Sequence, residues 1–232
     1  IPVLREFFGE SLGNQIKTDF KQADLIIGNN VYAHVPDIND FTRGLKSLLK
    51  PDGIITLEFP HLKCLIEQTQ FDTIYHEHFS YLSLNTVIQI FSSVGLRVWH
   101  VEDISTHGGS LRIYGCHEED KRKTNNSVNK ILEEEVLKGL QKLETYINFG
   151  DRVNKIKDDL ISFLIEQKKK GKKIVAYGAA AKGNTLLNYS GIKPDLLPFV
   201  YDVAKSKQNQ FMPGSHIPIL SPKELMKTKP DF

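Results

Sequence analysis

The sequence has little of what several protein classes depend on. Its 232 residues include two cysteines, Cys64 and Cys116, which are too few for a disulfide framework or a four-thiolate zinc site. The 30 Lys and Arg against 28 Asp and Glu leave a net charge of +2. This balance excludes the strongly basic surface of a nucleic-acid clamp or a polybasic membrane binder.

Long apolar runs and targeting patterns are also missing. No run approaches the ~20 apolar residues that cross a bilayer, and no signal-peptide pattern is present. We therefore expect a cytoplasmic protein without membrane partners. The 40% of hydrophobic residues is sufficient for real cores, so disorder is excluded.

The length suits one large domain or two small ones. The chain starts at Ile1 without a methionine and stops at Phe232, where we expect a new segment to begin. We expect a piece of a longer polypeptide, and a processed mature protein is the alternative.

Strand and helix signals alternate in the first third. The apolar run at residues 23–29 predicts a buried strand, and apolar residues at helical spacing follow Pro36. A second strand is expected at residues 54–59, after a turn at residues 50–53 in which Gly53 supplies a positive φ. Strand, helix and strand in this order indicate a parallel crossover.

The next segments predict a change of strand direction. Ser83 caps a helix that Gly95 ends. Two β-rich segments follow at residues 96–102 and 110–117, joined by a short loop. We expect them to be antiparallel neighbours.

Composition changes at Glu118. A polar linker begins there, and a long amphipathic helix interrupted by Gly150 continues to Gly171. We interpret this arm as a packing or dimer helix. Residues 173–232 then alternate strand and helix again, which predicts a second, smaller α/β unit.

The densest polar cluster lies at residues 72–81. It holds two histidines, two carboxylates and two tyrosines. It closely follows the strand ending near Pro60, and ligands of open α/β sheets lie beyond the carboxyl ends of strands. A histidine there can act as acid or base near neutral pH, and a tyrosine can donate to an oxyanion. The alternatives are a hydrogen-bonded structural loop and, less favoured by the spacing of His76 and His78, a metal site.

Two more histidines follow strands or precede them. His34 comes shortly after the first strand, and a helix-capping role is its alternative. His107 precedes two glycines, and Ser110 and Arg112 beyond them could meet a phosphate. The alternative for this segment is a tight β-turn.

The segment from Gly178 has part of a dinucleotide fingerprint. Gly178 and Gly183 match the first and third glycines of G-x-G-x-x-G, but Ala180 replaces the second. Asp202 lies where a ribose-binding acid would be. Lys182 and helix amides could hold a phosphate, and an architectural turn is the alternative.

Five stretches together resemble a known family. They are residues 29–36, 71–81, 106–112, 177–185 and 213–219. The family is that of the S-adenosylmethionine-dependent sugar C-methyltransferases, which act on nucleotide-linked 4-keto hexoses, and the similarity covers nearly the whole chain.

The resemblance implies the fold. In the family a zinc-binding domain precedes a class I methyltransferase domain and a C-terminal Rossmann-like domain. Here it implies an α/β chain with a partial methyltransferase domain (1–117), a linker and helical arm (118–172) and a truncated Rossmann-like domain that binds the nucleotide sugar (173–232). Zinc is expected only in the absent N-terminal domain.

The resemblance also implies roles. His78 is the expected general base, with Glu77, Tyr75 and His34 in its pocket. The proton next to a ketone must leave before that carbon can attack the sulfonium methyl. The expected substrate-binding residues are His107, Ser110, Arg112, Lys182, Asn184 and Thr185, and the expected cofactor-binding residues are Asn29 and Asn30.

Two other functions remain open at this point. One is a nicotinamide-dependent nucleotide-sugar enzyme, suggested by Gly178, Gly183 and Asp202, and the other is a non-catalytic nucleotide-binding fragment. On the favoured reading we expect this chain alone to be inactive and to bind S-adenosylmethionine weakly, because the glycine-rich cofactor loop lies upstream. We expect a monomer or homodimer and no nucleic-acid partner.

Overall fold

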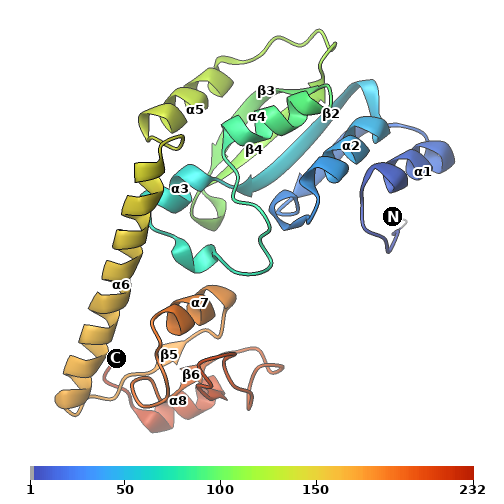
Figure 1. The fold of residues 1–232 in the computed structure, drawn as a ribbon. Coiled ribbons are helices and arrows are strands. Elements are labelled where there is room, and N and C mark those ends of the chain that lie inside the picture. The colour runs from blue at the N-terminus through green and yellow to red at the C-terminus, as the bar shows by residue number, and fades with distance from the viewer. Residues whose placement is uncertain (1–2) are drawn as a thin grey trace. The chain divides into compact units, whose positions relative to one another are not determined.

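A computed structural model describes residues 3–232 as an α/β protein (Figure 1). Contacts divide the chain into two compact units. The first comprises residues up to Gln68 together with His76–Thr145, and the second comprises Thr69–Tyr75 and Tyr146–Phe232. The start of the expected first domain, at residues 1–2, lies outside the described residues.

The elements of the first unit, in chain order, are α1 (Glu10–Phe20), β1 (Ala23–Asn29), η1 (Tyr32–His34), α2 (Ile38–Leu48), β2 (Leu49–Pro60), α3 (Leu62–Glu67), α4 (Leu84–Ser93), β3 (Leu96–Ile104), η3 (Thr106–Gly108), β4 (Ser110–His117) and α5 (Asn126–Leu137). The helix α6 (Leu143–Lys169) begins in this unit and continues in the second. The other elements of the second unit are η2 (Phe71–Thr73), β5 (Ala176–Tyr177), α7 (Ala181–Tyr189), β6 (Val200–Tyr201), β7 (Ile219–Leu220) and α8 (Pro222–Thr228).

The first unit is built on a four-stranded sheet in the order β1-β2-β4-β3. The strands β1 and β2 are parallel, which confirms the predicted crossover. The strand β4 runs antiparallel to both β2 and β3, so the predicted antiparallel pair is also confirmed. Ser83 caps α4 by accepting a hydrogen bond from the Thr86 amide, and Gly95 ends that helix at a φ of 75°.

One face of this sheet packs against helices to form the core of the first unit. Alternate residues of β2 point into it, and Ile55, Leu57 and Phe59 are completely buried. Figure 1 shows α2 and α4 lying across this face, and their apolar residues belong to the same core, as do Val128 and Ile131 of α5. On the other face of β1, Leu25 and Ile27 are exposed.

The predicted turn at residues 50–53 is wrong. These residues are part of β2, which begins at Leu49, and Gly53 is not among the residues with positive φ. The glycine is needed for a different reason. A Cβ atom at Gly53 would lie 2.7 Å from Leu49 Cδ1 and 3.0 Å from the carbonyl oxygen of Ala23, so close packing, not turn geometry, requires it.

The interruption of the long amphipathic segment lies earlier than predicted. Gly139, at a φ of 71°, follows α5, and Gly150 lies inside the 27-residue helix α6. Residues 118–172 are divided between the units, because Val128 packs in the first core and Leu164 packs in the second.

Replacing Gly150 by alanine should stabilise the protein. Nothing lies within 4 Å of a Cβ atom built at Gly150, and glycine inside a helix costs about 0.5–1 kcal/mol relative to alanine. We expect Gly150→Ala to raise the free energy of unfolding by about that amount in denaturant titrations. Gly139→Ala is the control and should lower it, because its φ is positive and its Cβ would lie 2.9 Å from Thr145 Oγ1.

The second unit has a smaller parallel sheet in the order β5-β6-β7. Its core gathers Leu164 of α6, Leu187 of α7 and Ile217 before β7, among others. Ser221 caps α8 by accepting from the Lys223 amide, with Pro222 at the first helical position. Within residues 3–232, none of the helices combines the length and the apolar composition that a membrane span requires.

Candidate functional site

Most of the predicted site residues of the first unit lie at one edge of its sheet. The parallel strands β1 and β2 end there, and β4 starts there because it runs in the opposite direction. The register pairs Asn29 with Glu58 and Glu58 with Arg112. The amide of Asn30 donates to the carbonyl of Glu58 over 2.9 Å. The cofactor and substrate candidates Asn29 and Arg112 therefore flank a single residue of β2.

His34 and His78 lie together at this edge, although 44 positions separate them in the sequence. Their ring centroids are 4.7 Å apart with an interplanar angle of 72°. The loop that carries His78 is fixed to η1, because the amides of Phe79 and Ser80 both donate to the carbonyl of Ala33. The ring of Tyr81 lies 5.9 Å from that of His78.

The position of η1 is set from the core. Tyr32 is completely buried, its ring packs near those of Phe41 and Phe59, and its hydroxyl shares a 2.8 Å hydrogen bond with Thr42. Burial raises the pKa of the Tyr32 hydroxyl well above its ordinary value. This residue therefore stays neutral and serves as an anchor that holds His34 two residues further on.

The histidine loop, residues 72–81, also carries the candidates Tyr75, His76 and Glu77. His76 and Glu77 are exposed in a turn, and Tyr75 belongs to the second unit. Among residues 3–232, no group of three or more His, Cys, Asp or Glu side chains could hold a metal ion.

Sequence reasoning missed Glu58. Its side chain is buried, and it accepts hydrogen bonds from Thr106 Oγ1 at 3.0 Å and from Arg112 Nη2 at 2.9 Å. The hydrogen bond to Glu58 raises the pKa of Arg112. The guanidinium is thus paired within the protein. No local signal identified Glu58, because β2 also contains Lys50 and Asp52 and a carboxylate in a strand is usually exposed.

The segment around His107 is an irregular loop. His107 has a φ of 54° and Gly109 a φ of 116°, and His107 is exposed. Ser110 is 1% exposed, and its hydroxyl donates to the carbonyl of Thr106 over 3.0 Å. The Ser110 hydroxyl therefore holds the loop together, while the His107 side chain is available to solvent.

In the second unit, Asp202 closes the loop that follows β5. Its two carboxylate oxygens accept from the amides of Ala179 and Ala204, each over 2.7 Å. These amide hydrogen bonds lower the pKa of Asp202. Lys207 adds a 2.7 Å hydrogen bond to the carbonyl of Ala179. The carboxylate proposed for a ribose contact is therefore engaged with the backbone.

The helix α7 carries the remaining substrate candidates. Lys182 is exposed and Asn184 is half-buried, and the Asn184 Oδ1 atom has no hydrogen-bond partner among the described residues. The Thr185 hydroxyl donates to the carbonyl of Ala181. The segment that contains Tyr75 packs on α7, where Phe71 of η2 lies 5.2 Å from the ring of Tyr189.

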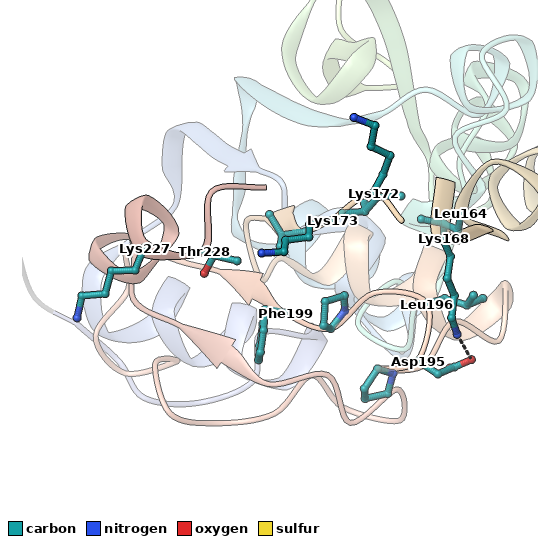
Figure 2. Close-up of a pocket in the computed structure, with 13 residues that line it drawn as sticks. Leu164, Lys168, Lys172, Lys173, Asp195, Leu196, Phe199, Lys227 and Thr228 are labelled. Carbon is teal, nitrogen blue, oxygen red and sulfur yellow. Dashed lines mark ion pairs between the residues drawn. The ribbon is translucent and has the colours of Figure 1, made fainter. Parts of the chain in front are cut away.

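A pocket of about 470 Å³ lies elsewhere in the second unit. The residues before β5 and β6 line it, so it lies at the amino ends of these strands, opposite the Gly178 loop. Figure 2 shows Lys168 directed to Asp195, at 3.8 Å, and Lys227 directed away. Lys172 pairs with Asp231. The lysines that line this pocket thus do not point toward a common centre. We therefore do not place the functional site in this pocket.

Two family patterns match the chain. Residues 105–232 match the family described as C-methyltransferase C-terminal domain, and residues 5–101 match a methyltransferase domain. The C-methyltransferase NovU of Streptomyces niveus is 36% identical over 225 residues, which cover 97% of this chain and 54% of that protein. The chain thus spans about half the length of this curated relative.

Solved methyltransferases show a weaker likeness. A SAM-dependent methyltransferase from Anabaena variabilis has a TM-score of 0.39 at 11% identity, covering 50% of this chain and 57% of that one. Magnesium protoporphyrin IX methyltransferase from Synechocystis has a TM-score of 0.33 at 15% identity, covering 41% of this chain and 45% of that one.

Proposed function

The chain belongs to the C-methyltransferase family, and from this premise we propose that the polypeptide carrying it methylates a carbon next to the ketone of a nucleotide-linked keto-deoxysugar. The methyl donor is S-adenosylmethionine. The substrate class rests on the resemblance of the five sequence stretches, above all residues 71–81 and 177–185. The observation that supports the chemistry is the contact between the imidazole rings of His34 and His78 at the sheet edge.

His78 is the proposed general base. A neutral imidazole near pH 7 can accept the proton from the carbon next to the carbonyl. The electron pair of that C–H bond stays on the substrate as an enolate. Its carbon would bond to the methyl group as the bond from that group to the sulfonium sulfur breaks, and the thioether S-adenosylhomocysteine would leave. To His34, whose ring centroid lies 4.7 Å from that of His78, we assign the role of orienting His78 or of donating to the developing oxyanion. We assign supporting roles to Glu77 and Tyr75.

The residues at the end of β1 fit the polar parts of the methyl donor. Asn29 and Asn30 are exposed at the same edge as His78, and amide side chains can both donate and accept hydrogen bonds. We assign cofactor contacts to them. When bound, S-adenosylmethionine supplies an electrophilic methyl group on a sulfonium sulfur.

We assign contacts with the nucleotide half of the substrate to α7 of the second unit. The loop of His107 carries the substrate-binding candidates of the first unit. The exposed ammonium of Lys182 suits a diphosphate, and Asn184 and Thr185 follow it in the first turns of the helix. His107 is exposed and can contact substrate directly. For Ser110 and Arg112 we propose an indirect role, because they are engaged with Thr106 and Glu58.

The test uses the full polypeptide with ¹³C-methyl-labelled S-adenosylmethionine and nucleoside-diphosphate 4-keto-deoxyhexoses. We expect a new carbon-bound methyl signal in the product by nuclear magnetic resonance. A methyl group on oxygen or nitrogen, or none with any keto sugar, would contradict the proposal. Calorimetric titration tests the nicotinamide alternative, since tight NAD binding without nucleotide-sugar binding would favour it.

A further inference from the structure

A buried carboxylate of α5 holds the amino end of α4. Glu135 is 1% exposed. Its Oε1 atom accepts from the Leu84 amide over 2.6 Å, and its Oε2 atom accepts from the Asn85 amide over 3.1 Å. The amides of a helix's first turn have no partner inside the helix, and negative charge is favourable at this end. Glu135 therefore fixes the residues that directly follow the histidine loop.

The same carboxylate holds a buried histidine. Glu135 Oε1 lies 2.8 Å from Nε2 of His61, which is 1% exposed. A carboxylate can only accept hydrogen bonds, so the tautomer of His61 that fits this contact is the one that donates from Nε2. His61 lies directly after β2, at the edge of the sheet where His34 and His78 meet.

The backbone at His61 connects two loops of the site. Its amide donates to the carbonyl of Gly109 over 3.0 Å, next to η3 and His107. The following amide, of Leu62, donates to the carbonyl of Leu82 over 2.9 Å, and Leu82 lies four residues after His78. The backbone of residues 61 and 62 thus joins the His107 loop to the segment that follows the histidine loop, and Glu135 holds the side chain of His61 between them.

We propose that Glu135 is a positioning residue for the reaction, acting through His61 and the amino end of α4 to hold His78 and His107 in place. The inference rests on the proposed function. Glu135 belongs to the segment that matches the C-terminal family pattern, yet it acts on the sheet edge of the methyltransferase domain. Its buried charge accepts three hydrogen bonds, so removing the charge leaves donors unpaired.

The experiment compares Glu135→Gln with Glu134→Gln in the full polypeptide. Glu134 directly precedes Glu135 and forms an ion pair with Lys63 of α3. The side chain of Glu134 is 33% exposed, whereas that of Glu135 is buried. Both changes remove one charge from neighbouring positions of α5. Measurements are made at a temperature at which both variants are folded, as judged by circular dichroism.

Positioning predicts a specific kinetic result. We expect Glu135→Gln to lower kcat about 10-fold or more, because a displacement near 1 Å can cost up to about 100-fold. The KM for S-adenosylmethionine should stay within about twofold. Glu134→Gln should leave both constants near the wild-type values. An unchanged kcat for a folded Glu135→Gln variant would overturn the proposal, as would an equal loss for Glu134→Gln.

A second readout separates this proposal from the proposed function. Hydrogen exchange of the His61 and Leu62 amides should be faster in Glu135→Gln and unchanged in Glu134→Gln, whether or not the wild type transfers methyl groups. Unchanged exchange at both amides would overturn the positioning role. A wild type without methyl transfer but with this exchange pattern would contradict the proposed function only.

Discussion

Replacing His78 by alanine should lower methyl transfer about 100-fold or more in the full polypeptide, because general bases contribute about 10²–10⁴-fold. His34 remains in the variant, but its position is set separately by η1 and Tyr32. The KM for S-adenosylmethionine should change little, since the lost group acts on the other substrate. Steady-state kinetics with a nucleoside-diphosphate keto sugar measures the effect.

A second measurement isolates the proton transfer. In heavy water without methyl donor, the wild type should exchange the proton next to the ketone for deuterium, and His78→Ala should not. His76→Ala is the matched control, since His76 lies two positions away and is exposed. Near-normal turnover of His78→Ala, or an equal loss in His76→Ala, would rule out the role of His78.

The fold of the first unit could be predicted well from local patterns. The strand at residues 23–29, the cap at Ser83 and the glycine at Gly95 each depend on residues near one another in sequence, and the structure confirms all three. The predicted burial of that strand is wrong, because β1 lies at the edge of the sheet and none of its residues is buried. The placement of His34 and His78 at one edge could also be predicted, because strand direction fixes where the loops lie.

Interactions between distant segments could not be predicted in this way. Glu135 and His61 are 74 positions apart, and Glu58 and Arg112 are 54 apart. Each looks like an ordinary polar residue until the register of β2 and β4 and the packing of α5 are known. Ser110 is a local case, because its hydroxyl, expected to face a phosphate, donates to the carbonyl of Thr106 only four positions away.

Gly53 and Gly150 show a related limit. A glycine signals either a positive φ or a lack of space, and its neighbours in sequence do not decide between them. At Gly53 the reason is close approach to Leu49 and Ala23. At Gly150 the structure shows neither reason, so a helix break was predicted where the helix continues.

Replacing Asp202 by asparagine should destabilise the second unit by about 2 kcal/mol, because hydrogen bonds to charged groups contribute about 1.5–3 kcal/mol. Asparagine can accept from only one of the two amides, of Ala179 and Ala204, that now donate to the carboxylate. Its NH₂ group would face the other. Hydrogen exchange of residues 176–202 measures the change, while fluorescence of Trp99 reports on the first unit and should not change. Asp195→Asn is the control, since that carboxylate is exposed and its ion pair is 3.8 Å long.

The pH dependence of this stabilisation has a definite sign. The amides of Ala204 and Ala179 lower the pKa of Asp202 in the folded protein, so the unfolded chain binds the proton more readily. The stabilisation is fully present above the unfolded pKa of about 3.9 and is lost as pH falls through the lower folded value. The difference between wild type and Asp202→Asn should therefore be constant near neutral pH and shrink below about pH 4. If Asp202 instead binds the ribose of a nicotinamide cofactor, Asp202→Asn should leave the exchange of residues 176–202 unchanged at every pH and weaken NAD binding.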